Sequence, residues 1–180
     1  MRIKLSYEEL ESLTTELFKK VSSEFRPEMI IHPGVRTDYL ISKAESQFGM
    51  KPVIVDTSRP FPFKKLMRLI FYDMFDQIPD PIAEYMADQY IQIVHSESKR
   101  PRMIREDVLE DIPINTSNVL IIDDVFCTGQ TSNVITRALS SRGISNVKTA
   151  VLIYTPVNDG RPDFYMLEGK YSLPWRNIGV

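Results

Sequence analysis

One stretch, residues 118–131, constrains the fold more than any other part of this chain. Its first five residues, Asn-Val-Leu-Ile-Ile, are almost continuously apolar, which indicates a strand buried on both faces. Asp123 and Asp124 follow, and a short turn leads into an amphipathic helical pattern that ends at Gly143. A buried strand followed directly by a turn and a helix is typical of an α/β fold with a mostly parallel sheet.

The order of side chains in this stretch indicates a site for a phosphorylated sugar. Two carboxylates at the carboxyl end of a strand lie where open α/β sheets place ligands, and they suit vicinal hydroxyls or a hydrated cation. Gly129 lets backbone approach a ligand, and Thr128 and Thr131 add hydroxyls beside the N–H groups of a helix terminus. The alternative is an ordinary strand-turn-helix with an acidic cap. Because each part of the string has a distinct role, we interpret it as a sugar 5-phosphate site.

Residues 118–131 resemble the phosphoribosyl diphosphate (PRPP) motif of type I phosphoribosyltransferases: an apolar strand, two acids, three residues and Thr-Gly-x-Thr. The Gly-Lys-Ser/Thr of a Walker A loop and the Gly-x-Gly of a dinucleotide fingerprint are absent from it. The resemblance implies that Asp123 and Asp124 are the catalytic pair, which holds the ribose hydroxyls and reaches Mg²⁺, directly or through water. It assigns the PRPP 5-phosphate to the turn formed by Thr128, Gly129, Gln130 and Thr131.

A second strand-turn-helix pattern precedes the first. Residues 29–31 indicate a strand, and a helical pattern that ends at Gly49 follows the turn. The amides of a tight Pro33-Gly34 turn beside Arg36 can face an anion, but the residues alone favour a plain β-α turn. We assign His32 to the turn or the core. The resemblance implies that the turn binds the pyrophosphate half of PRPP, although Pro-Gly-Val-Arg replaces the common Arg-Gly-Gly or Lys-Gly-Gly. The residues assigned to pyrophosphate are Pro33, Gly34, Val35 and Arg36.

The rest of the chain fits one phosphoribosyltransferase-like domain over residues 1–180, with a central sheet flanked by helices and a small hood. Ser6 and Glu9 form a capping box before an N-terminal helix that packs on the sheet. Residues 61–89 carry apolar side chains at helical spacing and are expected to form a helical insertion. The resemblance also implies a flexible loop that closes over the site, for which the basic stretches at 58–65 and 95–107 are the candidates. The alternative is that these charged residues form a solvated face. Further strands are expected at 52–56, 90–94, 147–154 and 163–167.

The C-terminal segment 155–180 is similar to the tail of bacterial xanthine-guanine phosphoribosyltransferases, with a Gly-Arg-Pro loop, a short strand and a Pro-Trp. The resemblance implies that this segment is a hood over the base, and that Cys127, Tyr171 and Trp175 contact the base. From the residues alone, the commoner role of a Trp and a Tyr in such a segment is to close the core. Two positions depart from 6-oxopurine enzymes: Cys127 replaces an acid, and Thr155 replaces a lysine. A cysteine flanked by acids favours its neutral thiol and is a poor general base. Hypoxanthine and guanine are therefore expected to be poor substrates.

Composition indicates which compartment and which partners to expect for the protein. The net charge of −2 over 180 residues gives no global sign of a nucleic-acid or membrane surface. The single cysteine excludes an internal disulfide and fits a reducing compartment. The N-terminus carries no apolar signal segment, and no apolar run is long enough to span a bilayer. We therefore expect a cytoplasmic protein, with no membrane partner and no nucleic-acid partner.

The expected function is a Mg²⁺-dependent phosphoribosyltransferase, a pentosyltransferase of nucleotide metabolism such as purine salvage. It would move ribose 5-phosphate from PRPP to a purine or pyrimidine base and release pyrophosphate, and a homodimer is expected. The alternative is a regulator of the same fold that senses PRPP or a nucleotide. The string Asp-Asp-Val-Phe-Cys-Thr-Gly-Gln-Thr also resembles the version in pyrimidine-operon regulators. An RNA-binding regulator would need a strongly basic face, which the net charge does not favour.

Overall fold

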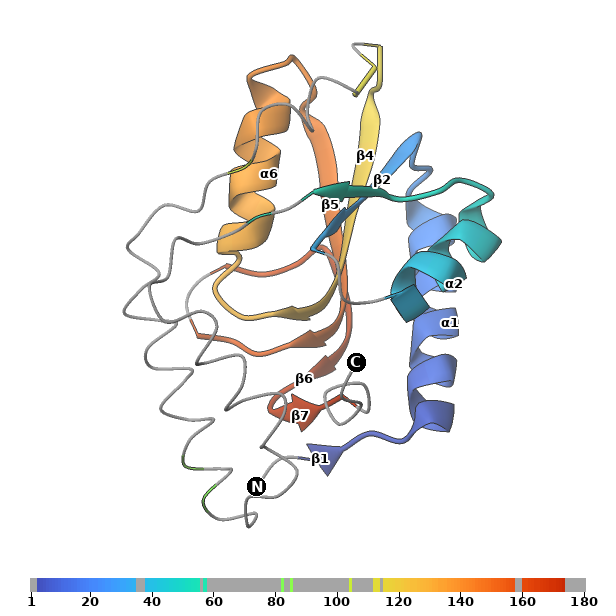
Figure 1. The fold of residues 1–180 in the computed structure, drawn as a ribbon, viewed down its shortest axis with the longest axis vertical. Helices are drawn as coiled ribbons and strands as arrows, with labels where there is room; N and C mark the ends of the chain where they lie inside the picture. The colour runs from blue at the N-terminus through green and yellow to red at the C-terminus, as the bar shows by residue number, and fades with distance from the viewer. Residues whose placement is uncertain are drawn as a thin grey trace.

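A computed structural model describes residues 3–34, 38–55, 115–157 and 160–173, together with positions 57, 82, 85, 104, 112 and 113. Within these residues, five parallel strands form one sheet in the order β3-β2-β4-β5-β6 (Figure 1). The strands are β2 (Met29–Pro33), β3 (Val53–Val55), β4 (Asn118–Phe126), β5 (Asn146–Tyr154) and β6 (Phe164–Glu168). The expected parallel α/β architecture is confirmed.

Helices cover both faces of this sheet (Figure 1). On one face lie α1 (Tyr7–Glu24) and α2 (Asp38–Phe48), and on the other lies α6 (Gln130–Ser140). Alternate residues of β4 point to opposite faces of the sheet, as in any β-strand. Leu120 and Ile122 belong to the core cluster of α1 and α2, whereas Val119 and Ile121 belong to the cluster of α6. The central strand is therefore buried on both sides, as its sequence predicts.

The N-terminal helix has the predicted start. Ser6 Oγ accepts a hydrogen bond from the Glu9 N–H at 3.2 Å, and the Ser6 N–H donates to Glu9 Oε2 at 2.8 Å. The two contacts make a complete capping box. The apolar side of α1, which includes Leu10, Leu17 and Val21, is fully buried in the core beneath the sheet.

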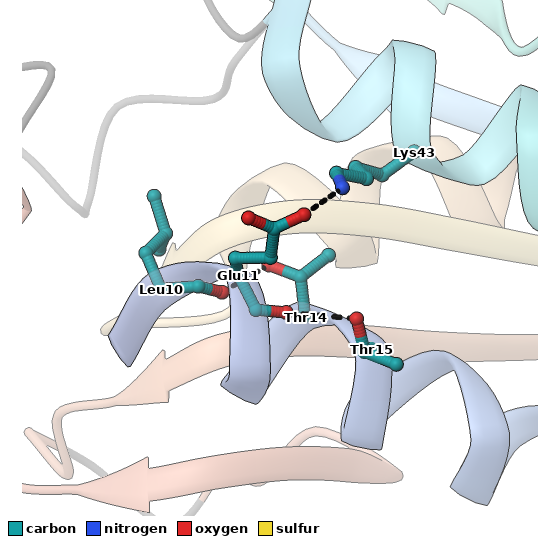
Figure 2. Close-up of polar contacts among 5 residues, drawn as sticks. All are labelled: Leu10, Glu11, Thr14, Thr15 and Lys43. Atoms are coloured by element: carbon teal, nitrogen blue, oxygen red, sulfur yellow. Dashed lines mark hydrogen bonds and ion pairs between the residues drawn. The ribbon is translucent and has the colours of Figure 1, made fainter. Parts of the chain in front are cut away.

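A contact between exposed side chains joins α1 to α2 (Figure 2). Lys43 Nζ of α2 donates to Glu11 Oε1 of α1, and the two groups form an ion pair. Thr14 and Thr15 donate to the carbonyls of Leu10 and Glu11 one turn earlier, at 2.7 and 2.8 Å. Such back-bonding satisfies the two threonine hydroxyls within α1.

The expected end of the central strand at Ile122 is wrong. β4 runs four residues further, to Phe126 (126 − 122 = 4), and Asp123 and Asp124 are part of it. The physical reason is the neighbouring strand. β5 is equally long, at nine residues each, and pairs Asp123 with Val151 and Phe126 with Tyr154. The ladder thus includes Asp123 and continues past Asp124, whose N–H is satisfied by the Asp123 side chain, and the side chains of both acids stay half-buried.

A second, two-stranded sheet joins the two ends of the described chain. β1 (Ile3–Lys4) pairs in parallel with β7 (Tyr171–Ser172), so that Ile3 lies opposite Tyr171. This pairing was not expected from the sequence. It ties the segment before α1 to the segment assigned to the hood.

Several expectations fall outside the described residues. They are the strand at 90–94, Asp56 at the end of the strand at 52–56, and the candidate loops at 58–65 and 95–107, of which only position 104 is described. Of the expected helical insertion at 61–89, only Ile82 and Tyr85 are described, and both are helical and exposed. Among the described helices, none is both long and apolar enough to cross a membrane.

Candidate functional site

The candidate site begins with two acids at the carboxyl end of the central strand. Asp123 and Asp124 are both half-buried, and Asp123 Oδ1 accepts a hydrogen bond from the Asp124 N–H at 2.8 Å. This contact fixes the orientation of the Asp123 carboxylate against the backbone. Because successive residues of a strand point in different directions, the two carboxylates offer their oxygens from two sides of β4.

The turn after β4 is built around Gly129. This residue has a φ of +68°, in the left-handed region, and is the N-cap of α6. A β-carbon at Gly129 would stand 2.5 Å from Cζ of Phe126, so both the backbone conformation and the space require glycine. The predicted helix start near Gly129 is confirmed.

The amino end of α6 is suited to an anion. Gly129 makes no side-chain cap, and the first turn of the helix contains no acidic residue. The first N–H groups of a helix have no acceptor within the helix itself, and the helix dipole favours negative charge there. Buried Ile135 and Leu139 pack against the sheet and hold the helix on it. The turn of Thr128 to Thr131 therefore has the local form that phosphate binding needs.

The second predicted turn follows the neighbouring strand β2. Ile31 of β2 pairs with Ile121 of β4, and Gly34 and Asp124 each lie three residues further along (34 − 31 = 3; 124 − 121 = 3). Because the two strands are parallel and adjacent, their ends meet at one edge of the sheet. The structure thus brings the Pro33–Gly34 turn and the acid pair together. Val35 and Arg36 lie outside the described residues.

The backbone of Gly34 is half-buried and hydrogen-bonded to the protein. Its N–H donates to the Val55 carbonyl of β3 at 3.0 Å, and its φ is +105°. In this conformation the Gly34 amide does not face a ligand, in contrast to the expectation that the turn amides face an anion. His32 is buried, with 2% of its surface exposed, as expected for a core histidine. Its Nδ1 lies 3.0 Å from the Gly34 carbonyl oxygen.

Two of the three predicted base-contacting residues, Cys127 and Tyr171, lie close in sequence to a backbone junction at the ends of β4 and β5. The Thr155 N–H donates to the Phe126 carbonyl at 2.8 Å, and Thr155 Oγ1 donates to the Gly169 carbonyl at 2.8 Å. Cys127 directly follows Phe126 and is half-buried. Tyr171 follows Gly169 by two residues, is half-buried and packs against the main core. Trp175 lies outside the described residues.

A row of aromatic rings beside the site has no role in the sequence-based assignment. Phe126 and Tyr154 lie 6.0 Å apart between ring centroids, and Tyr154 and Tyr165 lie 5.3 Å apart. Arg161 lies over the Tyr165 ring and donates to its hydroxyl, which raises the pKa of the guanidinium above its usual range. The row spans β4, β5 and β6, so it becomes visible only once the order of the strands is known.

The residues present fit a Mg²⁺ ion that is shared with a substrate. Carboxylate oxygens are the ligands that Mg²⁺ prefers, and this ion is commonly held by one or two carboxylates together with substrate phosphates. Across the described ranges, no group of three or more His, Cys, Asp and Glu side chains forms a cage for a metal. Asp123 and Asp124 are therefore the residues that could hold such an ion.

Comparisons with known proteins identify the family to which this chain belongs. The family model described as the phosphoribosyl transferase domain matches residues 82–180. No curated protein sequence matches the chain significantly. A purine phosphoribosyltransferase from Pyrococcus horikoshii has a similar structure, with a TM-score of 0.62, 18% identity and coverage of 99% of this chain and 96% of that chain.

Two further solved structures share the fold. A xanthine-guanine-hypoxanthine phosphoribosyltransferase from Helicobacter pylori has a TM-score of 0.64 at 11% identity, over 98% of this chain and 94% of that chain. A hypothetical protein from Neisseria gonorrhoeae with bound ppGpp has a TM-score of 0.57 at 13% identity, over 97% and 90%. The structural likeness supports the fold, and the family model covers more than half of the sequence. The chain therefore belongs to the phosphoribosyl transferase domain family, whose enzyme class is the PRPP-dependent pentosyltransferases.

Proposed function

We propose that this protein transfers ribose 5-phosphate from PRPP to a nitrogenous base, purine or pyrimidine, and releases pyrophosphate. The observation that carries the proposal is the junction of β4 and α6. There, two acids on the strand stand a few residues before a left-handed Gly129 at the amino end of the helix. This order suits a ligand that carries a diol and a phosphate at a fixed separation.

Each part of the site has a proposed role in binding PRPP. Asp123 and Asp124 accept hydrogen bonds from the ribose hydroxyls, and the turn of Thr128, Gly129, Gln130 and Thr131 holds the 5-phosphate. The turn at Pro33 to Arg36 meets the pyrophosphate at the same sheet edge. Cys127, Tyr171 and Trp175 contact the base, for which aromatic side chains provide stacking surfaces.

The proposed catalysis comes mainly from positioning. The two ends of ribose 5-phosphate are fixed by β4 and α6, so the anomeric carbon is held between the base and the departing pyrophosphate. Positive charge develops on the ribose as the bond to pyrophosphate breaks, and the half-buried acid pair stabilises that charge. Asp123 and Asp124 would hold Mg²⁺, which would supply charge neutralisation for the departing pyrophosphate.

The experiment that tests this function is release of pyrophosphate from PRPP and Mg²⁺ against a panel of purine and pyrimidine bases. Base-dependent release, with a matching nucleoside 5′-monophosphate as product, is the expected result. Release that does not depend on any base would indicate simple hydrolysis of PRPP. Binding of PRPP without release across the whole panel would contradict the proposal.

A second candidate function is a sensor of PRPP or a nucleotide that regulates a partner. Two observations favour it: Cys127 occupies the place of the acid found in 6-oxopurine enzymes, and a structural neighbour is a protein with bound ppGpp. A sensor would bind one nucleotide tightly and turn over no base in the same panel. We retain the enzyme as the first proposal because the family is one of transferases.

The compartment, the oligomeric state and the domain organisation of the protein are also proposals. We infer a cytoplasmic homodimer formed by one domain over residues 1–180, with a helical insertion at 61–89 and a hood at 155–180. Size-exclusion chromatography with light scattering would test the dimer.

A further inference from the structure

Thr155 is a half-buried residue to which the proposed function gives no role. It directly follows β5, and its hydroxyl donates to the Gly169 carbonyl at 2.8 Å. Gly169 belongs to the turn between β6 and β7, and β7 begins with Tyr171. The Thr155 hydroxyl therefore links the end of β5 to the turn that leads into Tyr171.

The backbone of Gly169 is fixed on both sides by this link and by a second hydrogen bond. The Gly169 N–H donates to the Tyr154 carbonyl at 2.9 Å, and the Gly169 carbonyl accepts from Thr155 Oγ1. Because each peptide group is planar, the two contacts fix the planes before and after Gly169. Its φ of +136° is one that glycine adopts readily, and glycine has many other conformations available. Without the Thr155 hydroxyl, the second plane would lose its side-chain donor.

The ring of Tyr171 lies against this turn. Tyr171 Cε2 is 3.4 Å from the place that a β-carbon of Gly169 would occupy, which is ordinary contact distance. Part of the Tyr171 side chain packs against the main core, and the residue is half-buried. On its other side, Tyr171 pairs with Ile3 of β1. The position of the ring thus depends on the Gly169 turn on one side and on the β1–β7 ladder on the other.

The same threonine also contacts the strand that carries the acid pair. The Thr155 N–H donates to the Phe126 carbonyl at 2.8 Å, and Cys127 follows Phe126 directly. In Figure 1, β7 lies at the end of the sheet where β4 leads into the turn before α6. Thr155 therefore connects β4 through its backbone and the Gly169 turn through its side chain.

We propose that Thr155 is a positioning residue that sets the place of Tyr171 and thereby the affinity for the base. Its hydroxyl holds the Gly169 turn, and the turn supports the ring that stacks on the base. The proposal rests on the proposed function, in which Tyr171 contacts the base. Thr155 itself does not contact the base in this role, since its one hydroxyl proton is donated to Gly169.

Two substitutions at Thr155 separate the hydroxyl from the shape of the side chain. Thr155→Val keeps the shape and removes the donor, whereas Thr155→Ser keeps the donor and removes the methyl group. Each protein is titrated calorimetrically with ribose 5-phosphate and with AMP, GMP, CMP and UMP. Ribose 5-phosphate lacks a base and is the matched control ligand. The ratio of its Kd to the Kd of the tightest nucleotide measures the contribution of the base.

The expected result is a selective loss of the base contribution. Thr155→Val should lower this ratio about tenfold, and Thr155→Ser should stay within about threefold of the wild type. Ribose 5-phosphate should bind all three proteins alike. In a Tyr171→Leu background, which itself lowers the ratio, Thr155→Val should cause no further loss, because the ring that it positions is absent. A general loss of stability would not produce this dependence on Tyr171.

Several outcomes would overturn the role of Thr155 alone. They are an unchanged ratio in Thr155→Val, an equal loss in Thr155→Ser, and a loss that persists in the Tyr171→Leu background. An unchanged ratio in Tyr171→Leu would also overturn it, because the ring would then not contact the base. If Thr155→Val does not fold, Thr155→Ala takes its place against Thr155→Ser. Wild-type protein that binds neither ribose 5-phosphate nor any nucleotide would overturn the proposed function as well.

Discussion

The ring of Phe126 lies directly against Gly129, so closely that the glycine has no room for a side chain. The contact joins the last residue of β4 to the N-cap of α6 and leaves 2.5 Å between Phe126 Cζ and the place of a β-carbon. Phe126 also pairs with Tyr154 in the ladder, and its carbonyl accepts from the Thr155 N–H. The turn assigned to the 5-phosphate therefore rests on a surface that is fixed by two strands.

This contact predicts the effect of Gly129→Ala. The substitution forces an alanine into a left-handed conformation, at about 1 kcal/mol, and pushes its methyl group into the Phe126 ring. We expect a lower unfolding midpoint and a loss of ribose 5-phosphate affinity of at least about tenfold, since the turn must move. Thermal unfolding and calorimetric titration measure the two effects.

Gly143 provides a matched control at the other end of the same helix. Its φ is +85°, but nothing lies within 4 Å of the place of its β-carbon. Gly143→Ala should therefore lower stability through backbone strain and leave ribose 5-phosphate affinity unchanged. Equal affinities in the two variants would show that the Gly129 turn does not hold the phosphate.

The acid pair predicts a loss of activity without a loss of fold. Asp124→Asn keeps the shape of the side chain but removes the negative charge that faces the ribose, so turnover should fall by at least about a hundredfold. Steady-state pyrophosphate release measures it. Asp163→Asn is the control, because Asp163 binds Lys148 Nζ and the Thr149 N–H, in the first half of β5. Near wild-type turnover in Asp124→Asn would refute the diol-binding role.

The hydrogen bonding of Thr155 predicts which bases are poor substrates. Its hydroxyl has one proton, and that proton is donated to the Gly169 carbonyl at 2.8 Å. Thr155 therefore cannot also donate to the oxygen of a 6-oxopurine, and a neutral Cys127 is a poor acceptor for the ring proton. We expect kcat/KM for hypoxanthine and guanine to stay below about 10⁴ M⁻¹s⁻¹. Higher values from steady-state kinetics would show that other residues read the base.

The ion pair between Glu11 and Lys43 predicts a small effect that depends on pH. The hydrogen bond to Glu11 is the main cause that raises the pKa of Lys43 above its ordinary value of 10.5. A raised pKa stabilises the fold at pH values below the unfolded pKa, and this stabilisation disappears as the pH rises through the folded pKa. Lys43→Met should thus lower the unfolding midpoint slightly at pH 8 and not at a pH above the raised pKa of Lys43. A difference that persists at high pH would mean that the ion pair is not its source.

The β4–α6 unit was predictable from sequence because its signals are local. An apolar run specifies a strand that is buried on both faces, and Gly129 and Gly143 mark the two ends of the helix. Two strands, 147–154 and 163–167, were expected within one residue of the observed β5 and β6. The parallel architecture followed, because strands that alternate with helices need crossover connections.

The features that the sequence did not predict depend on partners far away in the chain. Asp123 and Asp124 resemble the end of a strand by residue type, and only the length of β5 shows that the ladder continues to Phe126. The two-residue strands β1 and β7 have no periodic signal of their own. The role of the Gly34 amide was also hidden, because its acceptor, Val55, belongs to another strand.

The most direct test of the account is the position of the 5-phosphate in a crystal structure of the protein with PRPP and Mg²⁺. We predict that this phosphate lies at the amino end of α6, within hydrogen-bonding distance of the turn at Thr128 to Thr131, with the ribose hydroxyls against Asp123 and Asp124. A PRPP molecule bound with its 5-phosphate anywhere else on the protein would contradict the account.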